Sequence, residues 1–269
     1  MTLGHECVAQ VAEIGNGVKD FCVGDIVAVP AITPDWSQQD VNENPAHAGE
    51  NFSAHMLGKS IDGAFQDAFY IPYADKNLAH IPANVTLEQA LMCVDVVSTG
   101  FTAAEEANIK QGDTVVVMGI GAIGLAAIMG AYFYGAAKVY AVGSREENVK
   151  IAESLGAEVI NYKTLKCALP NGMHPNANST NSEVVNYVLT QTNTKGVDCV
   201  LICGGNDLSF PQAVDMVKYG TGIVSNVMYF GAVLGEHENG IDAIQIPKFS
   251  IGRGMAGKTL KFSLAKGGR

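Results

Sequence analysis

Hydrophobic and polar residues follow two different patterns along this chain. In the first part, apolar residues alternate with polar ones over residues 7–14, 26–30, 63–72 and 78–82, which predicts short β-strands. Closely spaced turns join these runs, and short strands with such turns are typical of a small β-barrel. In the second part, β-branched runs alternate with Ala- and Leu-rich segments, which predicts strands joined by helices.

The second pattern allows individual elements to be assigned. It predicts helices at residues 86–92, 98–108, 125–134, 147–155, 183–191 and 208–217. It predicts strands at residues 114–118, 138–142, 158–162, 197–202, 222–227 and 259–263. Strands that alternate with helices imply a doubly wound parallel sheet, whose ligands bind at the carboxyl ends of the strands. The predicted fold class is therefore α/β, with a β-barrel domain followed by a Rossmann domain.

A glycine-rich turn lies between the predicted strand at residues 114–118 and the helix that follows. Its sequence is Gly119-Ile120-Gly121-Ala122-Ile123-Gly124, which matches the GxGxxG pattern of dinucleotide-binding proteins in the required strand–turn–helix context. Gly119 would permit the tight turn, Gly121 would let a pyrophosphate approach the backbone, and Gly124 would let helix and strand pack closely. Unpaired N–H groups at the helix N-terminus would bind the phosphates.

A transmembrane helix is the alternative interpretation of this stretch. Residues 115–135 are almost wholly apolar and about long enough to span a bilayer. Three glycines at turn spacing and the early β-branched run favour the strand–turn–helix interpretation instead.

The end of the next strand carries information about the coenzyme. A unit that binds NAD usually has Asp or Glu there for the ribose 2′-hydroxyl. This chain has Gly143-Ser144-Arg145, in which a small residue leaves room, Ser144 can donate a hydrogen bond and Arg145 can pair with a 2′-phosphate. The sequence therefore favours NADP over NAD, the alternative being an ordinary loop with a solvated arginine.

Composition and charge exclude several other functions. The chain has 269 residues, 48% of them apolar, which is enough for one large domain or two ordinary ones. Its formal net charge of −10 disfavours nucleic acids and anionic membranes as partners. Six scattered cysteines without a CxxC pair favour free thiols in a reducing compartment, so we expect a cytoplasmic protein.

The motifs together resemble a known family. The chain is similar to the zinc-containing medium-chain alcohol dehydrogenases, and most of all to the NADP-dependent secondary-alcohol dehydrogenases of anaerobic bacteria and protists. The motifs that carry the resemblance are Gly4-His5-Glu6, Pro34-Asp35-Trp36, Asn77-Leu78-Ala79-His80 and Gly143-Ser144-Arg145. The resemblance implies a GroES-like catalytic domain at residues 1–98, an NADP-binding Rossmann domain at 99–245, and a last strand with the return to the catalytic domain at 246–269.

The resemblance also implies a catalytic zinc site. His5 would be a zinc ligand, Glu6 a secondary or exchangeable ligand, and Asp95 would stand where most zinc relatives have Cys. Zinc accepts such nitrogen and oxygen ligands and would activate the alcohol for hydride transfer to NADP. Cys93 is the rival ligand, because it would share a face with Asp95 if this stretch were an extended strand.

Further coenzyme contacts are implied beside the glycine turn and the Gly143-Ser144-Arg145 segment. The resemblance places Tyr162 near the adenosine phosphate, and Ile120, Ile123 and Asn226 are assigned to the coenzyme site as well. It further implies a homo-oligomer, most simply a tetramer, which acts on small alcohols and ketones.

The chain departs from the family pattern at both ends. In the family, a Cys ligand and a Ser or Thr and a His that relay the proton precede the Gly-His-Glu motif, and further elements follow the final Gly-Gly-Arg. Because this chain begins at that motif, we expect a truncated protein with little activity of its own. A non-catalytic NADP-binding protein and a zinc-free quinone reductase on the same scaffold are the alternative functions.

Overall fold

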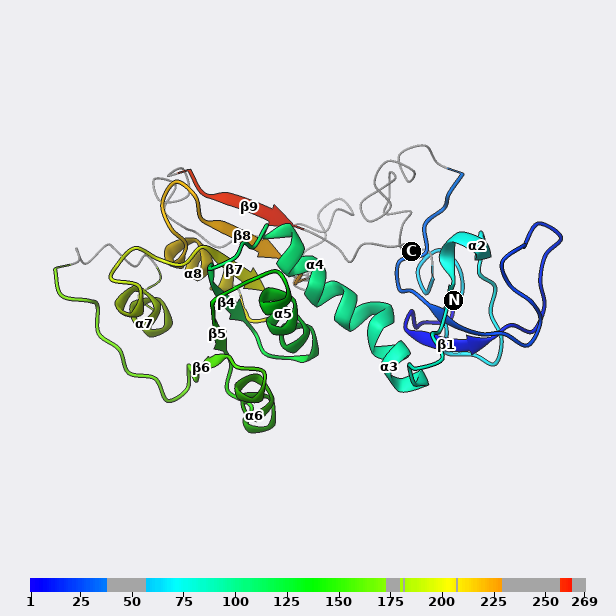
Figure 1. The fold of residues 1–269 in the computed structure, drawn as a ribbon, viewed down its shortest axis with the longest axis horizontal. Helices are drawn as coiled ribbons and strands as arrows, with labels where there is room; N and C mark the ends of the chain where they lie inside the picture. The colour runs from blue at the N-terminus through cyan, green and yellow to red at the C-terminus, as the bar shows by residue number, and fades with distance from the viewer. Residues whose placement is uncertain (38–56, 173–179, 181, 207, 229–256, 263–269) are drawn as a thin grey trace. The chain divides into compact units, whose positions relative to one another are not determined.

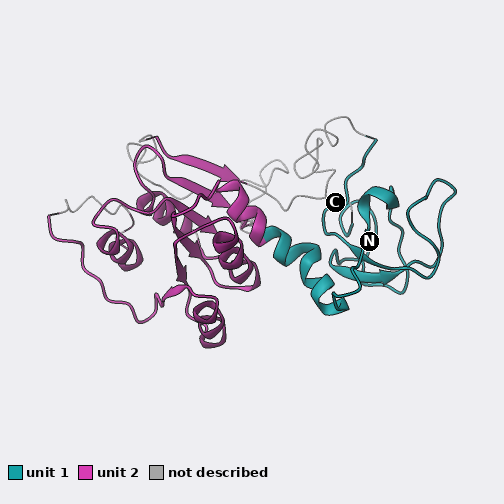
Figure 2. Ribbon diagram, viewed as in Figure 1, with its two compact units in different colours: residues 1–99, 264–269 teal, residues 100–263 magenta. Residues whose placement is uncertain are grey.

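The computed structural model divides the chain into two compact units (Figure 2). Unit 1 contains Met1–Thr99 and unit 2 contains Gly100–Ser263. The structure describes all residues except 38–56, 173–179, 181, 207, 229–256 and 263–269.

Unit 1 is built on a small antiparallel sheet with the strand order β1-β2-β3. Its elements are β1 (Cys7–Gln10), β2 (Ile26–Val29), α2 (Ala74–Asn77), β3 (Ala79–His80), α3 (Leu87–Met92) and the π-helix η1 (Cys93–Val97). The inward side chains of β2, Val27 and Val29, pack with Phe21 and Leu57 to form its core. Thr86 caps α3 and forms a reciprocal capping box with Gln89, as the sequence predicted for the N-cap.

The strand predicted at residues 63–72 does not form, and this prediction was wrong. The backbone N–H groups of Gly63, Ala64 and Phe65 instead donate to the carbonyl oxygens of Thr2, Gly4 and Leu3. A Cβ at Gly63 would collide with the backbone of residues 3 and 4. The apolar alternation therefore belongs to a turn that packs against the N-terminal segment. The hydrogen bonds from this turn hold the N-terminal segment in place.

Unit 2 contains a six-stranded parallel sheet with the order β6-β5-β4-β7-β8-β9 (Figure 1). Its strands are β4 (Thr114–Met118), β5 (Lys138–Val142), β6 (Glu158–Ile160), β7 (Cys199–Ile202), β8 (Ile223–Asn226) and β9 (Thr259–Phe262). Its helices are α5 (Ala122–Phe133), α6 (Glu146–Ser154), α7 (Glu183–Gln191) and α8 (Ser209–Met216), while α4 (Ser98–Glu106) begins at the end of unit 1. Each lies where the alternating pattern predicted a strand or helix, and the fold is the doubly wound α/β arrangement.

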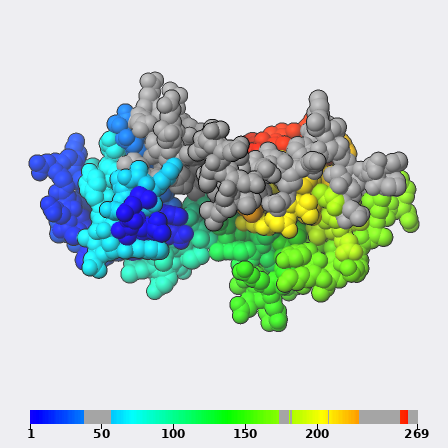
Figure 3. All heavy atoms as spheres, turned by 180° about the vertical axis from the view of Figure 1, so that it is seen from behind, coloured from blue at the N-terminus to red at the C-terminus, as the bar shows by residue number. Residues whose placement is uncertain are grey.

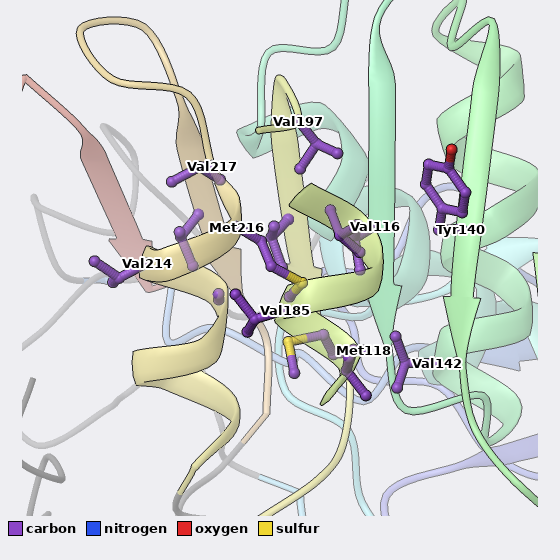
Figure 4. Packing of buried hydrophobic residues seen from close by; sticks show 14 of the residues in the cluster. Val116, Met118, Tyr140, Val142, Val185, Val197, Val214, Met216 and Val217 are labelled. Carbon is purple, nitrogen blue, oxygen red and sulfur yellow. The ribbon is translucent and has the colours of Figure 1, made fainter. Parts of the chain in front are cut away.

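Hydrophobic cores cover both faces of this sheet. Val116 and Met118 of β4 face α7 and α8, in a cluster that Figure 4 shows from close by. The alternate residues Val115 and Val117 face α4 and α5 on the other side. Strands that are buried on both faces read as continuous apolar runs, which explains why 114–118 resembled part of a membrane span. In the described part of the chain, no helix has the length and apolar character needed to cross a bilayer.

Ser225 in β8 offers a test of the packing of the sheet. Its side chain is fully buried, and its Oγ has no hydrogen-bond partner among the described residues. A buried hydroxyl without a partner costs about 1–3 kcal/mol. We therefore expect Ser225→Ala to raise the melting temperature by roughly 2–4 °C, the shift that about 1 kcal/mol gives in a protein of this size.

Ser209→Ala is the matched control for this substitution. Ser209 is also buried, but its Oγ accepts a hydrogen bond from the backbone N–H of Asn206 at 3.0 Å. Its replacement should lower the melting temperature, measured by calorimetry on both variants. A lower melting temperature for Ser225→Ala would mean that the hydroxyl is satisfied in solution.

Candidate metal and coenzyme sites

The N-terminal segment places His5 and Glu6 immediately before β1. Gly4 has a left-handed φ of 99°, which a residue with a side chain adopts at a cost. A Cβ at Gly4 would also meet the ring of Phe65 at 2.7 Å. The segment lies on the surface of unit 1, dark blue in Figure 3, and both His5 and Glu6 are exposed. The turn at residues 63–65 thus fixes the backbone from which the two side chains project.

Asp95 comes from the π-helix η1, which continues α3. A π-helix arises where a helix accommodates extra residues, and such segments occur frequently at functional sites. The interpretation that Cys93 shares a face with Asp95 on an extended strand was wrong, because residues two apart on a helix point in different directions. Cys93 is exposed, whereas Asp95 is half-buried. The helical backbone thus separates the thiol from the carboxylate.

His5, Glu6 and Asp95 converge although 90 residues separate the first from the last. His5 Nε2 lies 3.3 Å from Asp95 Oδ2. One ligand atom from each of the three side chains lies within 4.8 Å of the other two. Thr99, which is buried, donates from Oγ1 to Asp95 Oδ1 at 2.7 Å. This hydrogen bond orients the carboxylate so that its second oxygen faces His5.

Electrostatics at this cluster follow from its geometry. The hydrogen bond with Asp95 raises the pKa of His5 above its usual value of 6.5. The same bond, together with the one from Thr99, lowers the pKa of Asp95. Burial, and then the charge of Asp95, raise the pKa of Glu6. Two carboxylates beside one imidazole form a negatively charged group that favours a cation.

The donor set fits zinc. One imidazole nitrogen and two carboxylate oxygens are ligands that zinc accepts, and three protein ligands leave a position for a substrate in a catalytic site. A hydrogen bond that orients a ligating carboxylate, as Thr99 provides here, is the usual second layer of such a centre.

Zinc affinity should depend on pH because zinc and a proton compete for His5. Since the pKa of His5 is raised, its imidazole stays protonated to a higher pH than an isolated histidine would. We expect apparent zinc affinity to fall as the pH is lowered through this pKa, and to level off above it. Competition with a chromophoric chelator from about pH 5 to 8 measures this dependence.

His80→Gln provides the control for this titration. His80 stacks on Phe21 and its Nε2 lies 2.9 Å from the carbonyl oxygen of Asp20, so it lies apart from the cluster. The pH dependence should be unchanged in this variant. An affinity that is flat over the same range in the unmodified protein would show that His5 does not bind the metal.

In unit 2, the three glycines of the turn have distinct structural roles. Gly119 has a φ of 83°, and a Cβ on it would meet the backbone of Gly204 at 2.6 Å. A Cβ on Gly124 would collide with the carbonyl oxygen of Gly119. A Cβ on Gly121 would meet nothing within 4 Å, and Gly121 is the N-cap residue of α5. The turn therefore leaves open space at the helix N-terminus, where a pyrophosphate is expected.

The remaining predicted coenzyme residues lie at the carboxyl ends of the strands. Ser144 and Arg145 follow β5, and Arg145 is exposed at the N-cap position of α6. Tyr162 follows β6 and its side chain is 52% exposed, so the ring is accessible to a ligand. Asn226 ends β8, donates from Nδ2 to the carbonyl oxygen of Met228 at 2.8 Å, and has a buried Oδ1 without a described partner.

The space beside Gly143 is occupied. The sequence suggested that a small residue there leaves room for a phosphate. A Cβ on Gly143 would instead collide with Cγ1 and Cδ1 of Ile120, a residue of the glycine turn that is 4% exposed. Gly143 is therefore small because Ile120 packs against it. Ile123, the other isoleucine of the turn, is half-buried within α5.

Family comparisons match both units. The alcohol dehydrogenase GroES-like domain matches residues 1–83, and the zinc-binding dehydrogenase domain matches residues 122–249. An NADP-dependent isopropanol dehydrogenase from Entamoeba histolytica is 42% identical over the whole chain, which covers 67% of that protein. One from Clostridium beijerinckii is 41% identical over the whole chain, which covers 70% of it.

Solved structures agree with this match. The alcohol dehydrogenase TADH from Thermus sp. ATN1 superimposes with a TM-score of 0.75 at 28% identity, over 98% of this chain and 68% of that one. An alcohol dehydrogenase from Aeropyrum pernix gives a TM-score of 0.75 at 21% identity, over 99% of this chain and 69% of that one, and shares its fold.

Proposed function

Because the chain belongs to the zinc-binding alcohol dehydrogenase family, we propose that it interconverts small secondary alcohols and ketones by hydride transfer with NADP. The observation that carries the proposal is the convergence of His5, Glu6 and Asp95 into one group that could hold a metal ion. The chain belongs to a family of zinc-binding dehydrogenases, and its second unit carries the complete glycine turn.

In the proposed metal site, each side chain has a distinct role. His5 and Asp95 would hold zinc, and Glu6, the more exposed carboxylate, would be a third or exchangeable ligand. Zinc supplies Lewis acidity, which lowers the pKa of an alcohol hydroxyl and polarises a ketone carbonyl. Thr99 keeps Asp95 in position through its hydrogen bond. Assignment of this ligand set, with Asp95 in place of Cys93, is part of the proposal.

The coenzyme site is proposed along the carboxyl ends of β4, β5, β6 and β8. The turn with Gly119, Gly121 and Gly124 would bind the pyrophosphate through backbone N–H groups. Arg145 and Ser144 would bind the 2′-phosphate, and the exposed ring of Tyr162 would pack on the adenosine end. Asn226, whose side-chain oxygen has no hydrogen-bond partner among the described residues, would contact the nicotinamide half.

Two broader assignments belong to the same proposal. A homo-oligomer, in the form of a tetramer, is what the family resemblance implies, and a cytoplasmic location is what the scattered free cysteines favour. The metal-ligand cluster supports a zinc enzyme over a zinc-free quinone reductase, because a zinc-free reductase has no need of three converging metal ligands. Turnover separates both enzymes from a coenzyme-binding protein without catalysis.

Coenzyme binding, zinc content and turnover test this function together. We expect the purified protein to bind NADPH more tightly than NADH by fluorescence titration, and to bind zinc by elemental analysis. The zinc-loaded protein should oxidise 2-propanol with NADP only at the low rate expected of this chain, followed as NADPH formation, and lose this activity when a chelator removes zinc. Equal affinity for the two coenzymes, or turnover that survives removal of zinc, would overturn the proposal.

A further inference from the structure

Ile120, the residue between the first two glycines of the turn, is held from two sides by the segment that follows β5. Its side chain packs against Gly143 so closely that no Cβ fits there. Its carbonyl oxygen accepts a hydrogen bond from Asn148 Nδ2 at 2.8 Å. The chain thus fastens both the side chain and the backbone of this one turn residue.

Asn148 lies in the first helical turn of α6, and its side chain contacts the glycine turn from there. The helix begins at Glu146 with Arg145 as its N-cap residue, so Asn148 is the third helical residue. The backbone N–H of Val149 donates to the carbonyl oxygen of Arg145, which closes this first helical turn. One short segment therefore carries both the arginine proposed for the 2′-phosphate and the amide that anchors the glycine turn.

The hydrogen bond acts on the peptide group that the pyrophosphate should meet. The carbonyl of Ile120 and the N–H of Gly121 belong to the same planar trans peptide, so they point in opposite directions. When Asn148 fixes the direction of the carbonyl, it also fixes the direction of the N–H. Donation to the carbonyl polarises the peptide as well, which strengthens its N–H as a donor.

We propose that Asn148 is a positioning residue for the coenzyme, which aligns the Gly121 N–H with the pyrophosphate through the carbonyl of Ile120. The inference rests on the proposed binding of NADP to this turn. Because both NADPH and NADH contain the pyrophosphate, loss of the Asn148 hydrogen bond should lower the affinity for both coenzymes by the same factor. Arg145, in contrast, should affect only the coenzyme with a 2′-phosphate.

Asn148→Leu tests this inference, because leucine has nearly the same shape and no donor. We expect the dissociation constants of NADPH and NADH to rise together by about three- to ten-fold, the effect of one net hydrogen bond. Their ratio should stay at the value of the unmodified protein. Asn148→Asp, which keeps the shape and replaces the donor by an acceptor, should weaken both coenzymes at least as much.

Tyr132→Phe is the matched control. Tyr132 OH donates to the carbonyl oxygen of Gly156 at 2.7 Å, so this variant also removes a side-chain bond to a backbone carbonyl in unit 2, at the far end of α6. It should lower the melting temperature and leave both dissociation constants unchanged.

Unchanged affinity in Asn148→Leu, or loss of NADPH affinity alone, would overturn the inference while leaving the proposed function intact. Failure of the unmodified protein to bind NADPH would overturn the proposed function and this inference with it.

Discussion

His5→Ala and Asp95→Ala should each abolish zinc binding and the activity that depends on it, whereas Cys93→Ala should preserve both. His5 Nε2 and Asp95 Oδ2 lie 3.3 Å apart, and each contributes one atom to the ligand group. Removal of one ligand from a three-ligand site leaves a pair that holds the ion weakly. Zinc per protein after dialysis, measured by elemental analysis, gives the result directly.

Cys93 is the informative comparison because zinc bonds well to thiolates. The residue is exposed and projects from the same π-helix as Asp95, two positions earlier. If Cys93→Ala lost zinc while Asp95→Ala retained it, the backbone of this segment would have to rearrange when the metal binds. Circular dichroism of each variant should show that the fold persists, so that loss of zinc reports on the ligands themselves.

Sequence patterns predicted the Rossmann unit well because its determinants are local. The β-branched runs of β4 and β5, the glycines between them and the apolar α5 each signal one element without reference to distant residues. In unit 1 the same method produced a false strand at residues 63–72. There the apolar residues serve a turn whose partners are Thr2, Leu3 and Gly4, about 60 positions away in the chain.

Sequence patterns also missed features of both candidate sites, because these features depend on individual contacts rather than on a periodic pattern. The π-helix at Cys93–Val97 has no hydrophobic period of its own, so the stretch resembled an extended strand. Thr99 and Asn148 look like ordinary polar residues in helices, and their importance comes from single hydrogen bonds to Asp95 and to the Ile120 carbonyl. A search for hydroxyl or amide residues one helical turn from a proposed ligand would have found Thr99 but not Asn148.

At Gly143 the structure gives a different physical reason for the small residue than the sequence suggested. Its small size was interpreted as room for a phosphate, whereas the structure shows Ile120 packed against it. An aspartate introduced at this position would therefore push against the side chain of Ile120, a residue of the glycine turn. Gly143→Asp should consequently lower the affinity for NADPH without a matching gain in the affinity for NADH. This variant therefore cannot serve as a simple test of coenzyme choice.

Arg145→Gln is the cleaner test of coenzyme choice. We expect it to lower the affinity for NADPH about 10- to 100-fold, while the affinity for NADH changes little. The guanidinium is exposed beside the N-terminus of α6, where it can form charge-assisted hydrogen bonds with a 2′-phosphate. Such bonds contribute about 1.5–3 kcal/mol, which corresponds to this range of affinity. Fluorescence titration with both coenzymes at one ionic strength measures the change.

Lys150→Gln removes the same charge from the same helix and separates specific contact from general attraction. Lys150 is exposed and forms an ion pair with Glu146 at 2.9 Å, four residues earlier in α6. If long-range charge alone favoured NADPH, Lys150→Gln would lower the affinity for NADPH as much as Arg145→Gln does. We expect its NADPH affinity to stay within about two-fold of the unmodified protein, because an exposed charge beyond contact distance is largely screened by salt. A comparable loss in both variants would assign the preference to the net charge of the helix rather than to Arg145.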